Sequence, residues 1–135
     1  MTDLTEEELD LLRQSFVWAR SGDVARMTEL LTKGVPSNLT NDRGDTLLIL
    51  AAYNRQDDMV RLLLEHDADV ERHNDNGQTA LGAAVFRQAP GIVALLLEAG
   101  AHPDTGPKSA REVAAFFDLP EMAALLPPPS TTTNR

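Results

Sequence analysis

The three histidines are the residues of this chain best suited to hold a metal ion. His66, His73 and His102 lie near helix ends or in the links between helices. A zinc site needs three or four converging ligands, usually from histidine and cysteine. The spacing lets His66 or His73 approach His102, but the chain has no cysteine to complete the set. The sequence therefore predicts exposed histidines and no bound metal or other cofactor.

The acidic residues suggest two further chemistries. The run 67–71 has alternating acids, as a calcium loop does, but lacks the required glycine and the closing glutamate. The acids at 57–58 and 6–8 lie at predicted exposed helix starts, where negative charge is favoured, whereas general acid–base catalysis requires burial or coupling. No Ser/His/Asp trio, Cys/His pair or phosphate-binding loop is present. We therefore expect that this protein is not an enzyme.

Thr46 and Thr79 carry hydroxyls at equivalent places in the chain. A threonine hydroxyl acts as a nucleophile only beside a base, whereas at the start of a helix it accepts hydrogen bonds from first-turn amides. Each threonine here precedes an apolar run. The pattern predicts two helix N-caps.

The elements that hold these residues repeat. The stretch 41–52 returns as 74–84, and Leu62-Leu63-Leu64-Glu65 returns as Leu95-Leu96-Leu97-Glu98, both after 33 residues. Such units cannot close a core alone and bury their apolar faces on their neighbours. The leucine runs are therefore predicted to be core, with Leu63 and Leu96 central. A stacked array offers a long surface rather than a pocket, which favours binding over catalysis.

Four helix pairs are predicted from apolar spacing and breakers. The expected helices cover about 5–20 and 24–33, 46–54 and 58–65, 79–87 and 90–100, and 109–117 and 120–126. The links 35–43, 68–76 and 101–108 are predicted to form β-hairpin-like fingers. Asn-Asp-x-Gly at 41–44 and 74–77 supplies turn side chains and a glycine able to adopt positive φ.

These units resemble ankyrin repeats. The segments 44–52, 59–64 and 67–71 match one whole unit, with Leu47 and Ile49 where proline and histidine are usual. The segments 77–84, 92–97 and 100–104 match the next. The first unit lacks the opening turn, and the last begins 30 residues on and has Arg111 in place of an inward leucine. The resemblance implies an all-α solenoid.

We divide the chain into an ankyrin-type domain over 1–127 and a disordered tail over 128–135. The units are 5–40, 41–73, 74–106 and 107–127, of which the first and last act as caps.

Composition limits the partners. The chain has 12 basic and 21 acidic residues, a formal net charge of −9, which disfavours nucleic acid. No apolar run approaches the roughly 20 residues that span a bilayer. The acidic N-terminal residues do not resemble a signal peptide, and cysteine is absent. We expect a cytoplasmic monomer that binds no membrane.

The resemblance implies that a protein partner binds the concave surface of finger tips and first helices. Tyr53, Phe86 and Phe116 occupy equivalent helix positions, with Arg20 matching them in the first unit. This aromatic row is either a binding groove or a seal between units. The predicted partner-binding residues are Arg20, Asp42, Arg43, Asp45, Tyr53, Asn54, Asp75, Asn76, Gln78, Phe86, Arg87, Phe116 and Phe117.

The acidic finger tips predict that the partner has a basic or amide-rich segment. Two alternatives stay open: a small-molecule or metal-binding protein, and an accessory that stabilises one dedicated partner.

Overall fold

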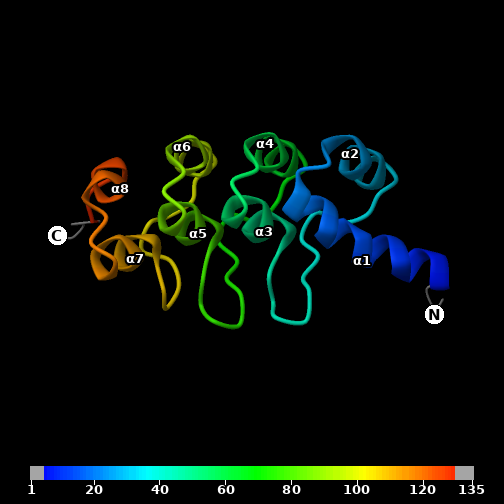
Figure 1. Cartoon of the computed structure of the whole chain (residues 1–135), viewed down its shortest axis with the longest axis horizontal. Helices are drawn as coiled ribbons and strands as arrows, with labels where there is room; N and C mark the ends of the chain where they lie inside the picture. Colours follow the sequence, from blue (N-terminus) through cyan, green and yellow to red (C-terminus); the bar gives the residue numbers. More distant parts are fainter. Residues whose placement is uncertain (1–4, 130–135) are drawn as a thin grey trace.

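The computed structural model describes residues 5–129, which fold into four antiparallel helix pairs stacked side by side (Figure 1). The helices are α1 (Glu6–Ser21), α2 (Val24–Thr32), α3 (Leu47–Tyr53), α4 (Asp57–Glu65), α5 (Ala80–Phe86), α6 (Pro90–Glu98), α7 (Ala110–Phe116) and α8 (Pro120–Leu125). The odd-numbered helices form one layer and the even-numbered helices the other. Most of the predicted tail, 130–135, lies outside the described residues.

The helix starts follow the predicted capping residues. Thr46 and Thr79 are almost fully buried, and each hydroxyl accepts a 3.0 Å hydrogen bond from the amide three residues on. Thr5 with Glu8, and Ser109 with Glu112, form complete capping boxes. Because the buried threonine hydroxyls are occupied by backbone amides, the N-cap interpretation is confirmed.

One apolar core runs through the stack between the two helix layers. Leu63 and Leu96 are both 0% exposed, which confirms their predicted central place. The long helix α1 differs because its 16 residues extend past the 7 residues of α3. Its first turns therefore lack a neighbour, and Leu9 and Leu11 are exposed.

The fingers project sideways from the first-helix layer (Figure 1). The side-chain oxygen of Asn74 accepts hydrogen bonds from the amides of Asn76 and Gln78, both 2.9 Å. Asn41 makes the equivalent bonds one unit earlier. Gly77 has φ 79°, a left-handed conformation that favours glycine. The first two fingers are each closed by a single antiparallel bridge, whereas Lys108 of the last link pairs in parallel with Gln78, and residues 5–129 contain no extended strand.

Arg111 makes polar contacts in the last unit at the position where an inward leucine is usual. Its guanidinium lies 2.7 Å from the Asp104 carboxylate and also donates to the carbonyl of Pro127. Hydrogen bonding from Arg111 lowers the pKa of Asp104 from its ordinary value. The ion pair of Arg111 and Asp104 therefore stabilises the fold at pH values above the ordinary pKa of Asp104. This contribution is lost as the pH falls through the lowered pKa.

In every unit, one residue in the turn between the paired helices has a left-handed backbone conformation. Gly22 is the first, with φ 78°, and Arg55, Gln88 and Asp118 follow at 59°, 54° and 52°. A residue with a Cβ is strained there by about 1–2 kcal/mol. The periodic sequence did not indicate this, because none of the last three is glycine.

Replacing Arg55 or Gln88 by glycine is expected to stabilise the protein. Relief of the left-handed strain outweighs the added freedom of the unfolded chain, leaving a gain of about 0.5–1 kcal/mol. Both side chains are exposed, so little packing is lost. Urea unfolding measures the change, and Gly22→Ala is the reciprocal variant, expected to destabilise. A lower urea midpoint for both glycine variants would contradict the strain argument.

Candidate functional site

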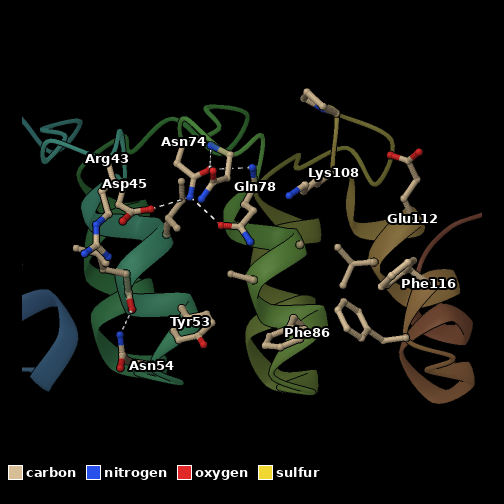
Figure 2. A pocket seen from close by; sticks show the side chains of 18 of the residues that line it. Arg43, Asp45, Tyr53, Asn54, Asn74, Gln78, Phe86, Lys108, Glu112 and Phe116 are labelled. Carbon is tan, nitrogen blue, oxygen red and sulfur yellow. Dashed lines mark hydrogen bonds between the residues drawn. The ribbon is translucent and has the colours of Figure 1, made fainter.

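A groove of about 820 Å³ crosses the stack on the side formed by the first helices and the fingers (Figure 2). It extends from the end of α1 to α7. Its lining residues are Arg20, Arg43, Asp45, Ile49, Leu50, Tyr53, Asn54, Asn74, Asn76, Gln78, Gly82, Ala83, Phe86, Pro107, Lys108, Glu112, Val113, Phe116 and Phe117. The groove is thus built by all four units rather than by one loop.

An aromatic row forms one wall of the groove. Tyr53 and Phe86 are the last residues of α3 and α5, and their rings stack with centroids 6.2 Å apart and planes 10° apart. Phe86 then meets Phe117 edge to face at 5.0 Å. The rings of Tyr53, Phe86 and Phe117 remain 41–49% exposed. All three residues line the groove.

The third ring of the row is not the one expected. Phe116 ends α7, as Phe86 ends α5, so the helix positions are equivalent. However, Phe116 is 82% exposed and contacts Phe117, whereas Phe117 contacts Phe86. No further helix pair covers α7 among the described residues, so Phe116 extends outward and Phe117 continues the row.

A side chain from the following unit holds Tyr53 in place. Nη1 of Arg87 donates to the carbonyl of Tyr53 at 2.7 Å, and its guanidinium lies 5.0 Å from the centre of the Tyr53 ring. Gln56 donates to the carbonyl of Arg20, which is the repeat equivalent of Tyr53, at 2.9 Å. Arg87 does not line the groove. Its guanidinium contacts the carbonyl and the ring of Tyr53.

Buried Asn74 joins two fingers at the opposite wall. Its side-chain amide donates to Asp45 at 2.7 Å and to Gln78 at 2.9 Å, as Figure 2 shows. The oxygens of Asp45 and Gln78 are therefore engaged within the array. The finger-tip acids Asp42 and Asp75 are exposed and do not line the groove.

The structure thus brings ten of the thirteen predicted partner-binding residues along one groove and leaves out Asp42, Asp75 and Arg87. Sequence reasoning missed nine lining residues: Ile49, Leu50, Asn74, Gly82, Ala83, Pro107, Lys108, Glu112 and Val113. Six of these nine residues could have been found from the sequence, because they form three pairs that follow the capping residues Thr46, Thr79 and Ser109 at the same spacing. These pairs are 49–50, 82–83 and 112–113.

Residues 5–129 contain no group of three or more His, Cys, Asp or Glu residues placed to hold a metal ion. His73 and His102 are exposed and His66 is half-buried. Within the described part of the chain, no helix is both long and apolar enough to cross a membrane.

A stack of helix pairs with hairpin-like fingers defines an α-solenoid repeat protein. The family model for ankyrin repeats matches three copies over residues 16–106, most of the chain. The chain belongs to the ankyrin repeat family. It is also 46% identical over 67 residues to a Pseudomonas aeruginosa protein named as an ankyrin repeat protein. That match covers 46% of this chain and 39% of the relative. Ankyrin repeats are generally protein–protein interaction modules and are typically non-catalytic.

Proposed function

We propose that this chain binds a protein partner, without catalysis, through the groove. The observation that carries the proposal is the exposed aromatic row of Tyr53, Phe86 and Phe117. Exposed aromatic rings on a rigid surface are frequent anchors of interfaces, because they bury large areas with little loss of conformational freedom. The groove is held by hydrogen bonds between units, so little ordering is required on binding.

The charge of the chain supports the finer proposal of a basic region on the partner. Asp42 and Asp75 are exposed at the finger tips, and the formal net charge is −9. Charges outside the groove steer association at long range and add modestly to affinity. We also propose that the protein is a monomer in the cytoplasm. The absence of cysteine fits a reducing compartment.

The double substitution Tyr53→Ala with Phe86→Ala is expected to abolish partner capture while circular dichroism and cooperative melting are retained. Tyr53 and Phe86 are 44% and 41% exposed, so their removal costs less stability than removal of a fully buried core leucine. Affinity purification with the immobilised chain, quantified by mass spectrometry, measures the partners that depend on these rings.

Two matched variants complete the experiment. Val17→Ala with Leu125→Ala removes equally exposed apolar side chains outside the groove and is expected to leave capture unchanged. Asp42→Asn with Asp75→Asn is expected to weaken capture modestly and to flatten its salt dependence. A well-folded aromatic variant with undiminished capture would refute the groove. A collapse of its melting temperature would show that the rings seal the stack.

A small-molecule ligand is the competing function, because a groove of about 820 Å³ falls within the size range of ligand sites. A thermal-shift screen with metabolites and metal ions separates it from the proposal. Stabilisation that is lost in the Tyr53→Ala, Phe86→Ala variant would favour the small ligand. An accessory that stabilises one dedicated protein would instead yield a single dominant partner in the purification.

A further inference from the structure

The groove has two unlike walls, one along the fingers and one along the ends of the first helices. Figure 2 shows Arg43, Gln78 and Lys108 on the finger side. The aromatic row forms the other wall, where Tyr53 and Phe86 are the last residues of α3 and α5. A segment bound along the groove therefore meets polar groups on one side and aromatic rings on the other.

The finger wall carries two positive charges that no acid of the array compensates. Arg43 and Lys108 are exposed, and among residues 5–129 neither of them forms an ion pair. With Arg20 at the end of α1, the groove holds three of the 12 basic residues but only two of the 21 acidic residues. Its charge balance therefore opposes the net charge of −9 of the whole chain, which favours acidic groups on the bound segment.

The two acids of the groove are already bonded within the array. Nδ2 of Asn74 donates to Oδ1 of Asp45 at 2.7 Å, and Nδ2 of Asn41 donates to Oδ2 of the same carboxylate at 3.4 Å. Oε1 of Glu112 accepts from the amide and the hydroxyl of Ser109, each at 3.3 Å. The fold thus occupies these carboxylates and leaves the cations of the groove to a partner.

Buried Asn74 also decides which group Gln78 offers to the groove. Nδ2 of Asn74 donates to the side-chain oxygen of Gln78 at 2.9 Å. Because that oxygen is occupied, the N–H groups of the Gln78 amide are the ones left to a partner, and Gln78 lies between Arg43 and Lys108 (Figure 2). Three successive units therefore line the finger wall with hydrogen-bond donors, which suit carboxylates.

The floor between the two walls is closed over α5. Gly82 and Ala83 line the groove but are buried. A Cβ built at Gly82 would lie 3.3 Å from the Thr79 hydroxyl and 3.4 Å from the carbonyl of Lys108. Successive side chains of an extended strand point to opposite sides. A strand lying flat on this floor therefore directs alternate side chains to the finger wall and to the aromatic row.

We propose that the groove binds an extended segment of the partner in which acidic and apolar residues alternate. The carboxylates meet Arg43, Gln78 and Lys108, and the apolar side chains lie against the aromatic row. The inference rests on the proposed protein-binding function and names the sequence pattern of the bound segment. The finger-tip acids Asp42 and Asp75 do not line the groove, so a basic region of the partner lies beyond this segment.

A displayed library of random ten-residue peptides, selected on the immobilised full chain, tests this inference. The enriched peptides are expected to carry Asp or Glu at every second position, with Leu, Ile, Val or Phe between them. A synthetic peptide of the same composition, with its acidic and apolar residues in two separate blocks, is the matched control. It is expected to bind about tenfold more weakly, because only the alternating order satisfies both walls along the whole segment.

Charge reversal on both sides of the contact tests the finger wall. Arg43→Glu with Lys108→Glu is expected to weaken the selected peptide about tenfold or more, and a peptide with lysine in place of its acids is expected to regain binding to this variant. Replacing the acids of the peptide by Asn or Gln leaves the chain unaltered and is expected to weaken binding to it by a similar factor. Asp42→Asn with Asp75→Asn is expected not to weaken the peptide, because neither acid lines the groove.

The outcomes separate the two proposals. Peptides that require Tyr53 and Phe86, yet show no alternation or bind the Arg43→Glu, Lys108→Glu variant equally well, would overturn this inference and leave the groove function standing. Enrichment of basic peptides, or equal binding of the blocked peptide, would also overturn the inference. If no enriched peptide depends on Tyr53 and Phe86, both proposals fail.

Discussion

A chain ended at Gly106 is expected to aggregate or to lose cooperative melting. The truncation removes α7 and α8, which pack on α5 and α6. The apolar surfaces around Phe86 and Leu95 then face water, and a repeat array depends mainly on contact between neighbours. The truncation also removes the 3.1 Å hydrogen bond from the Lys108 amide to the carbonyl of Gly77.

Light scattering after gel filtration and melting followed by circular dichroism measure this effect against the full chain. A soluble monomer of Gly106-terminated protein with an unchanged melting temperature would mean that the last helix pair is not a cap. A milder variant, Arg111→Ala, removes only the contacts to Asp104 and Pro127. It is expected to keep cooperative melting, which separates loss of the whole cap from loss of its polar closure.

Leu63→Ala and Leu96→Ala are each expected to lower the free energy of unfolding by about 2–5 kcal/mol. Both side chains are fully buried between the helix layers, so truncation leaves a cavity as well as removing apolar contacts. Denaturant titration measures the change. Leu125→Ala is the matched control, because Leu125 is exposed and should shift the unfolding free energy by less than about 0.5 kcal/mol. Core variants that shift it by less than about 1 kcal/mol would place these leucines outside the core.

The sequence predicted the fold well because the repeat carries local signals that tertiary packing reinforces. Threonine caps, apolar spacing and turn glycines all indicate the same elements, and most predicted helix ends lie within about one or two residues of the observed ones. The left-handed positions of Arg55 and Gln88 escaped prediction. Packing between helix pairs imposes that conformation on residues whose type does not favour it.

The candidate site was less predictable, because neighbouring side chains decide which residues face the groove. Phe116 and Phe86 share a helix position, yet the missing neighbour beyond α7 lets Phe117 take the contact. Asp45 lay at a predicted finger tip, but its carboxylate accepts a hydrogen bond from buried Asn74. Sequence register locates a residue along the repeat and does not show what touches it.

The length of the first helices sets the width of the groove. The helices α3, α5 and α7 have 7 residues each, and two turns measure about 10 Å, the diameter of one helix with its side chains. Four helices at about 8–10 Å spacing span roughly 24–30 Å, the length of about eight extended residues. The groove therefore has the dimensions of a single strip of polypeptide. On the proposed function, a short linear motif of the partner transplanted onto an unrelated carrier is expected to be captured.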